Sequence, residues 1–364
     1  MVQNVIDTAM TAEDLGYNSR LEEFRKGHNL SDLEFGRVIS EHKERYIVRT
    51  AQGEYEAEIT GNMRFTARSR EDFPAVGDWV ALTAYDHGTA IIHNIFPRSS
   101  VIARQAVGKS GEIQIIAANI DCAFLVQAVD RDFNINRLER YLTICHTSGV
   151  EPVIVLNKTD LISPDQLSEI LEKINLRIKD VRVIAISNNT LEGYDAIRAV
   201  ITKGKTYCML GSSGVGKSTL LNNLSGKAIM ETNAISVSTN KGRHVTSHRE
   251  LVVLDEGGIL IDNPGMREVG IADAAGGLEI TFDSILALSQ NCKFKDCTHV
   301  NETGCAVMKA VENGDIDEAS YQNYLSMERE REYFETTAAE KRKKERIFGK
   351  ILKDYYKRDI KQKR

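Results

Sequence analysis

The stretch Gly211-Ser212-Ser213-Gly214-Val215-Gly216-Lys217-Ser218 decides the fold that we expect for this chain. It fits the phosphate-loop pattern G-x-x-x-x-G-K-[ST]. The apolar run 207–210 before it predicts a strand, and residues 217–224 after it predict a helix, which is the context that the pattern requires. The glycines let backbone N–H groups surround a phosphate, and the helix N-terminus adds a partial positive charge. We therefore expect Lys217 to contact the β- and γ-phosphates of a nucleotide and Ser218 to bind Mg²⁺.

A second motif, Asn157-Lys158-Thr159-Asp160, indicates which base is bound. It follows the apolar run 153–156, so it lies at the carboxyl end of a predicted strand, where α/β sheets bind ligands. The Asp160 carboxylate can accept hydrogen bonds from guanine N1–H and the 2-amino group, a pair of donors that adenine lacks. Ser187 and Asn188, after another predicted strand, could complete the base pocket through backbone N–H groups. The motif predicts guanine specificity.

Two later segments supply candidate switch residues. Asp262-Asn263-Pro264-Gly265 ends a predicted hairpin, with Asp262 placed to hold Mg²⁺ through water and the Gly265 N–H placed to sense the γ-phosphate. Within 242–247, Thr246 offers a hydroxyl ligand for Mg²⁺. We predict these nucleotide-binding residues: Asn157, Lys158, Thr159, Asp160, Ser187, Asn188, Gly211, Ser212, Ser213, Gly214, Val215, Gly216, Lys217, Ser218, Thr219, Asp262 and Gly265.

The order of these motifs is itself informative. In an ordinary GTPase the phosphate loop precedes the base-reading motif, whereas here Asp160 and Ser187 come before Gly211. The same sheet can be built in this order only by circular permutation. The segment after Gly265 then leads directly into the cysteine-containing region, which gives a nucleotide-driven shift a covalent path to the C-terminal part.

The regions on either side of this core have different patterns. Residues 33–105 hold about five short alternating stretches separated by turns, which predicts an OB-type β-barrel. Such barrels often bind nucleic acid, but a barrel used only for packing is the alternative. The charge of this region does not indicate RNA binding, and its one basic spot is Arg64, Arg68 and Arg70.

Downstream, Cys292-x₄-Cys297-x-His299-x₅-Cys305 supplies three thiolates and an imidazole, a closed set for one tetrahedral, structural Zn²⁺. Cys122, Cys145 and Cys208 are scattered among apolar residues and are expected in the core.

Composition and charge limit the function classes. Apolar residues make up 42% and charged residues 27%, no apolar run approaches the length of a membrane span, and no signal peptide is evident, so we expect a cytoplasmic protein. The net charge is −5, yet residues 341–364 alone carry +9, which leaves −14 on the other 340. Helical spacing of apolar residues in this tail fits a basic amphipathic helix on RNA or a helix docked on its own domain.

Together, these motifs resemble the RsgA (YjeQ) family of ribosome small-subunit-dependent GTPases. The resemblance rests on the motifs above and on Gly77-Asp78-Trp79-Val80, Ala118-Asn119-Ile120-Asp121 and Gly242-Arg243-His244, and it covers about residues 33–330. It implies a late assembly factor of the 30S subunit whose GTPase is stimulated by that subunit. It also points to His244 as the group that positions water. Met266 stands where Ras-type enzymes have glutamine, so basal turnover should be slow.

We therefore predict a multidomain α/β protein: an extension (1–32), an OB barrel (33–106), a circularly permuted GTPase domain (107–270), a helical zinc-binding domain (271–340) and a basic tail (341–364). It should be a monomer that binds guanine nucleotide with Mg²⁺ and 16S rRNA of the 30S subunit, without a membrane, and leaves on GTP hydrolysis. The predicted catalytic residues are His244, Thr246 and Lys217. The alternatives are a phosphate-loop ATPase or small-molecule kinase, and a nucleotide-bound RNA adaptor without turnover.

Overall fold

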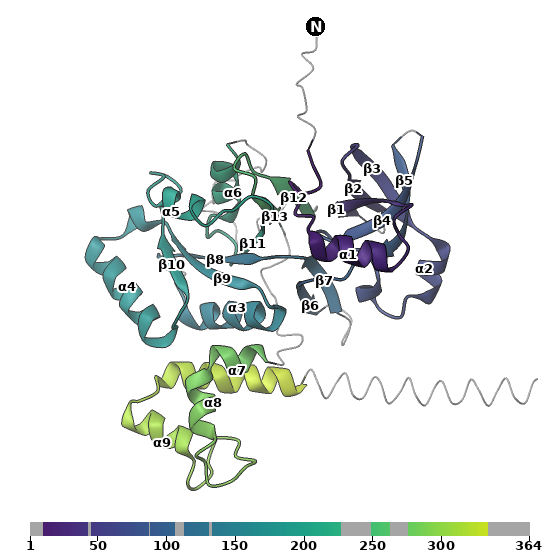
Figure 1. Cartoon of the computed structure of the whole chain (residues 1–364). Helices are drawn as coiled ribbons and strands as arrows, with labels where there is room; N and C mark the ends of the chain where they lie inside the picture. The colour runs from purple at the N-terminus through teal and green to yellow at the C-terminus, as the bar shows by residue number, and fades with distance from the viewer. Residues whose placement is uncertain are drawn as a thin grey trace, which may run out of the picture.

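The computed structural model describes residues 10–42, 45–86, 88–105, 113–130, 133–226, 249–262 and 276–333. Three units are visible along the chain (Figure 1): an N-terminal barrel, a central α/β unit and a C-terminal group of helices below it. Among the sequence predictions, His244, Thr246, Gly265, Met266 and the basic tail lie outside the described residues.

The N-terminal unit is a closed five-stranded barrel. Its strands are β1 (Glu34–His42), β2 (Arg45–Arg49), β3 (Glu54–Ile59), β4 (Trp79–Tyr85) and β5 (Thr89–Ile95). They pair in the order β1-β2-β3-β5-β4, and β4 pairs with β1 again and closes the barrel. Val38, Val48 and Ile92 fill its interior. Helix α2 (Gly61–Thr66) and the 3₁₀ turn η1 (Arg70–Asp72) connect β3 to β4. The OB-type barrel expected from the sequence is confirmed.

The central unit is a sheet covered by helices on both faces. Strands β8 (Cys122–Ala128), β9 (Glu151–Asn157), β10 (Arg182–Ala185), β11 (Thr206–Leu210) and β13 (Ile259–Asp262) run parallel in the order β10-β9-β8-β11-β13. All seven residues of β8 are buried, as expected of a central strand covered on both faces. Helices α3 (Ile135–Ser148) and α4 (Pro164–Arg177) cover one face, and α5 (Tyr194–Arg198) and α6 (Lys217–Ser225) cover the other. The turn η2 (Thr159–Leu161) follows β9.

The barrel and the central unit share one continuous sheet. Strand β12 (Arg249–Val253) pairs antiparallel with β13 on one side and with the end of β1 on the other. The sequence did not lead us to expect this connection. It also did not predict helix α1 (Ser19–Gly27), whose Leu21 packs near Trp79, or the separate hairpin of β6 (Val101–Gln105) and β7 (Ile113–Ala118).

The C-terminal unit is helical. It contains α7 (Gly277–Thr281), α8 (Asp283–Ser289), α9 (Ala306–Asn313) and a helix over residues 318–333. Leu278, Ile285, Val307 and Met327 form its small core. Helix α7 packs against α3 of the central unit, so the C-terminal unit lies against the face that α3 covers (Figure 1).

Candidate nucleotide site and metal centre

The phosphate loop lies between β11 and α6, as its pattern requires. Gly216 has φ +99 and precedes the first residue of α6; a side chain here would collide with the amides of Asn157 and Asn188. The ammonium group of Lys217 folds back across the loop and donates to the carbonyl oxygens of Gly211 at 2.7 Å and Ser212 at 2.6 Å. Ser218 and Thr219 follow in the first turn of α6. The loop is therefore shaped around a cation at a helix N-terminus, an arrangement that suits a phosphate.

The base-reading motif follows β9 on the same edge of the sheet. Asp160 Oδ1 accepts a hydrogen bond from Ser187 Oγ at 2.7 Å, and Oδ2 accepts one from Asn189 Nδ2 at 3.0 Å. These two hydrogen bonds, that from Ser187 first, hold the pKa of the exposed Asp160 carboxyl below its usual value. The carboxylate is thus charged and oriented at neutral pH, as a group that accepts hydrogen bonds from two N–H donors must be.

The remaining residues of the motif hold the carboxyl ends of the strands together. Thr159 donates from its backbone N–H and its hydroxyl to the carbonyl oxygen of Ile186, at 3.2 and 3.0 Å. Lys158 has a left-handed backbone with φ +68, and its ammonium group pairs with Asp130 at 2.8 Å.

Two side-chain amides contact the phosphate loop directly, one from the base-reading motif and one from Asn188. Asn157 Nδ2 donates to the carbonyl oxygen of Val215 at 2.7 Å, and Asn188 Nδ2 donates to that of Gly216 at 2.8 Å. The Asn157 Oδ1 accepts from the Asn188 N–H at 3.2 Å. Although the two motifs are separated by some fifty residues of chain, the structure brings them into one site.

Of the predicted segment 262–265, the structure describes only Asp262, and only its backbone. Asp262 is the last residue of β13, the strand that pairs with β11. It therefore lies on the same edge as the phosphate loop. The predicted partners Thr246, His244 and Gly265 lie outside the described residues.

The three cysteines and one histidine of the C-terminal unit converge. The ligand atoms of Cys292, Cys297, His299 and Cys305 all lie within 4.8 Å of one another. Cys292 Sγ is 3.9 Å from Cys305 Sγ, and the two sulfur atoms lie 3.6 and 3.5 Å from His299 Nδ1. Sulfur ligands about 2.3 Å from a tetrahedral Zn²⁺ would be about 3.8 Å apart. The cluster has dimensions that suit a four-coordinate metal ion, and Nδ1 is the His299 nitrogen that faces the sulfur atoms.

Groups around the cluster support its ligands. Backbone N–H groups of Ala306 and Met308 donate to the sulfur atoms of Cys292 and Cys305, both at 3.4 Å. The Tyr321 hydroxyl, from the helix over residues 318–333, donates to the carbonyl oxygen of His299. The three scattered cysteines lie elsewhere, in the buried core of the central unit, as predicted.

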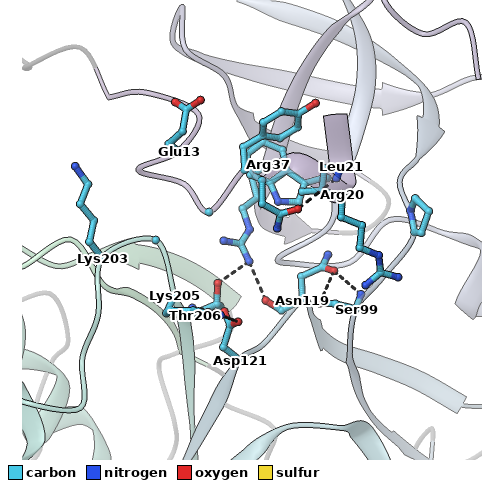
Figure 2. Close-up of a pocket in the computed structure, with 16 residues that line it drawn as sticks. Glu13, Arg20, Leu21, Arg37, Ser99, Asn119, Asp121, Lys203, Lys205 and Thr206 are labelled. Carbon is cyan, nitrogen blue, oxygen red and sulfur yellow. Dashed lines mark hydrogen bonds and ion pairs between the residues drawn. The ribbon is translucent and has the colours of Figure 1, made fainter. Parts of the chain in front are cut away.

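A third polar site was missed by the sequence reasoning. A cavity of about 270 Å³ lies where the N-terminal segment, the barrel and the central unit meet (Figure 2), and the buried side chain of Arg37 forms part of its wall. Its guanidinium donates to four neutral oxygens: Leu15 O at 2.6 Å, Thr206 Oγ1 at 2.9 Å, Gly77 O at 3.1 Å and Asn119 O at 3.2 Å.

Burial lowers the pKa of Arg37 to about 10, so it remains charged at neutral pH, and it forms no ion pair with any described residue. The available signal in the sequence was a charged residue between the small and apolar residues of Gly36-Arg37-Val38-Ile39. Arg37 joins the three segments, and two of its acceptors come from motifs that carried the family resemblance.

A family sequence model and the curated relatives of this chain all carry the same family name. The sequence model of one family, described as RsgA GTPase, matches residues 95–272. A Bacteroides thetaiotaomicron protein named small ribosomal subunit biogenesis GTPase RsgA 1 is 40% identical over 344 residues, covering 94% of this chain and 96% of the relative. A Lactiplantibacillus plantarum protein named small ribosomal subunit biogenesis GTPase RsgA 2 is 44% identical and covers 89% and 93%.

Solved structures agree with the fold. YjeQ from Thermotoga maritima superposes with a TM-score of 0.60 at 27% identity, covering 82% of this chain and 98% of that one. YloQ, described as a circularly permuted GTPase, gives a TM-score of 0.58 at 25% identity and covers 84% and 97%. Within the described part of the chain, no helix has the length and apolar character needed to cross a bilayer.

Proposed function

This chain belongs to the RsgA family, and we propose that it is a GTPase that acts in the biogenesis of the small ribosomal subunit. The observation that carries the proposal is the convergence of Asp160, Asn157 and the phosphate loop on one edge of the sheet. The curated relatives with this name cover nearly the whole chain.

In the proposed site, guanine binds at Asp160 and the triphosphate binds in the loop. The carboxylate accepts the N1–H and 2-amino hydrogen bonds of the base while Ser187 holds it in place. On binding, Lys217 exchanges two backbone carbonyls for phosphate oxygens, which are stronger acceptors. Ser218 and Thr246 would bind Mg²⁺, Asp262 would hold it through water, and the Gly265 N–H would sense the γ-phosphate.

Hydrolysis is proposed to depend on His244, which would position the attacking water, with Thr246 and Lys217 stabilising the transferred phosphoryl group. Met266 has no group that can orient water, so turnover should be slow until the 30S subunit is bound. Release from the subunit follows hydrolysis.

The proposals on the metal ion, the rRNA contacts, the oligomeric state and the domain limits rest on ligand chemistry and on membership of the family. Three thiolates and one imidazole are the ligand set of a structural Zn²⁺, which would stabilise the C-terminal unit. We propose that the barrel and this unit contact 16S rRNA, that the protein is a cytoplasmic monomer, and that the domain limits are those predicted from the sequence.

The deciding experiment measures phosphate release from GTP and from ATP, with and without purified 30S subunits. We expect slow release from GTP alone, strong stimulation by 30S and little release from ATP. The Asp160→Asn change should weaken GTP binding by about a hundredfold or more, because an amide cannot accept both guanine hydrogen bonds. The matched control is Asp165→Asn, an exposed carboxylate in the first turn of α4, which should leave binding unchanged.

Each alternative has its own signature in that experiment. Equal release from ATP and GTP would identify a phosphate-loop ATPase, and equal binding of ATP and GTP without phosphate release would indicate a small-molecule kinase. Tight GTP binding with no release at any concentration of 30S would identify an RNA adaptor without turnover. Any of these results would overturn the proposal.

A further inference from the structure

A polar network behind the nucleotide site links the base-reading loop to the phosphate loop. Its centre is the hydroxyl of Tyr194, the first residue of α5. This hydroxyl donates to Asn188 Oδ1 at 2.8 Å and accepts from Asn223 Nδ2 at 2.8 Å. Asn223 lies in α6, and its Nδ2 also donates to the carbonyl oxygen of Asn188 at 3.1 Å. Tyr194 is 95% buried, so its hydroxyl depends on these two amides for hydrogen bonds rather than on water.

The network determines which way the Asn188 amide faces. With Oδ1 occupied by the Tyr194 hydroxyl, Nδ2 of the same amide is directed to the carbonyl oxygen of Gly216. That carbonyl belongs to the peptide preceding Lys217, at the N-terminus of α6. The orientation of this peptide sets the direction of the Lys217 N–H, one of the donors that face a bound phosphate.

The other end of the network is the base pocket. Ser187 and Asn189, the neighbours of Asn188, both donate to the Asp160 carboxylate. When guanine binds Asp160, it therefore restrains residues 187–189 as one segment. Asn188, in the middle of that segment, contacts the phosphate loop.

We propose that Tyr194 is a positioning residue that couples recognition of the base to the grip on the phosphates. Its hydroxyl keeps the Asn188 amide in the one orientation that connects the guanine-restrained segment to the Gly216 peptide. Guanine thereby orders the phosphate loop. A base that does not bind Asp160 leaves residues 187–189 unrestrained, so its nucleotide gains no affinity from an ordered phosphate loop. The inference rests on the proposed guanine-nucleotide site.

The protein contains a matched tyrosine for the test. Tyr207 of β11 belongs to the same apolar cluster and is 97% buried. Its hydroxyl also has one donor and one acceptor partner, the Thr202 N–H and the Val200 carbonyl oxygen, both at 2.8 Å. Neither partner belongs to the base-reading or the phosphate loop, so Tyr207→Phe removes an equivalent hydroxyl without touching the proposed coupling.

The experiment measures the dissociation constants of GDP and ADP, each with Mg²⁺, for the full chain, Tyr194→Phe and Tyr207→Phe. For Tyr194→Phe we expect GDP to bind about tenfold more weakly and ADP to be unchanged, since loss of one buried hydrogen bond with its partner left unpaired has about this effect. The ratio of GDP to ADP affinity should therefore fall for this variant and stay constant for Tyr207→Phe.

Other outcomes overturn the inference. A Tyr194→Phe variant that weakens GDP and ADP by one common factor would show that the hydroxyl only supports the fold of the loop. An unchanged ratio, or an equal fall for Tyr207→Phe, would also reject it. If Tyr194→Phe does not fold, Asn223→Ala tests the same prediction. Its control is Asn222→Ala, the neighbouring position in α6. If the unmodified chain does not prefer GDP to ADP, the proposed function itself is wrong.

Discussion

The two junctions of the central unit are built from different kinds of contact. On the barrel side, β1 and β12 continue one sheet, so main-chain hydrogen bonds cross the boundary, and the buried Arg37 donates to three more carbonyl oxygens. On the C-terminal side, helix packing and side chains make the junction. Its centre is the buried carboxylate of Glu139 in α3.

The side chains at this second junction form a compact cluster. Glu139 accepts four hydrogen bonds: two from Arg177, one from Ser320 at 2.9 Å and one from Asn323 at 2.7 Å. A peripheral pair joins Arg140 to Glu330 at 2.7 Å. Gly277 of α7 approaches α3 so closely that any side chain there would collide with Thr147.

The difference has a mechanical meaning. Main-chain pairing across a sheet is insensitive to side-chain substitution, whereas a cluster of ionised and polar side chains depends on each of its members. We expect the barrel and the central unit to unfold together and the C-terminal unit to be separable. The predicted γ-phosphate sensor, Gly265, directly precedes the C-terminal unit in the chain. A separable unit would therefore be free to move when the bound nucleotide changes.

Removal of the proposed metal ion should have the largest effect. For a small metal-dependent unit, the binding free energy, about 10 kcal/mol or more, is also folding free energy. Chelation, or the change Cys305→Ser, should therefore abolish hydrogen-exchange protection in α8 and α9 while β8 and β11 stay protected. Cys122→Ser should keep the metal content of the unmodified protein. Protected α9 amides in the metal-free protein would contradict a structural role for the metal.

Breaking the side-chain junction at Glu139 should have the next largest effect. Glu139→Gln replaces the carboxylate that accepts hydrogen bonds from Ser320 and Asn323 of the C-terminal unit. It also leaves the Arg177 guanidinium of α4, only 9% exposed, without its buried ionised partner, at a total cost of about 3 kcal/mol. We expect thermal unfolding to separate into two transitions, the first of which releases the C-terminal unit.

The counterpart at the barrel junction is Arg37→Met. It removes four hydrogen bonds and a desolvated charge, and we expect a loss of about 2 kcal/mol in a single transition, since the paired strands remain. The contrast between the junctions would be refuted by a single transition for Glu139→Gln or by two for Arg37→Met.

The smallest effect should come from pH. His146, near the end of α3, lies 3.0 Å from Thr281 Oγ1, and burial holds its pKa below the ordinary value of 6.5. The unfolded chain therefore binds this proton more readily, so the stability contributed above pH 6.5 decreases as the pH falls.

The protection factors of the α7 amides, which correct the exchange rates for the pH dependence of intrinsic amide exchange, should fall between about pH 7.5 and about pH 6, with the metal content monitored. His146→Gln should remove that dependence. An unchanged pH profile in His146→Gln would assign the effect to other groups.

Local patterns allowed much of this molecule to be predicted. The strands before the phosphate loop and before the base-reading motif, the helix after Gly216 and the convergence of Cys292 and Cys305 all follow from short-range spacing, although β9 ends at Asn157, one residue later than predicted. The hairpin β6-β7 and helix α1 were missed because their stretches have weak periodicity and are stabilised by neighbours distant in sequence.

Residues of the site show the same division. Asp160 and Lys217 were predicted to bind nucleotide because the patterns that contain them are only four and eight residues long. Tyr194, Asn223 and Arg37 carry no such pattern. Their hydrogen-bond partners are up to 169 residues away, and a buried polar side chain has a role only once its partners are known.

By itself, the sequence determined the permuted order of the motifs and predicted the nucleotide class and the candidate metal-ligand set, because backbone torsions and ligand spacing are local properties. Only the tertiary structure decided how the units are joined: Arg37 at one boundary, Glu139 at the other and Tyr194 behind the site. The physical reason is that burial makes each of these polar groups dependent on partners that the folded chain alone brings within hydrogen-bonding distance.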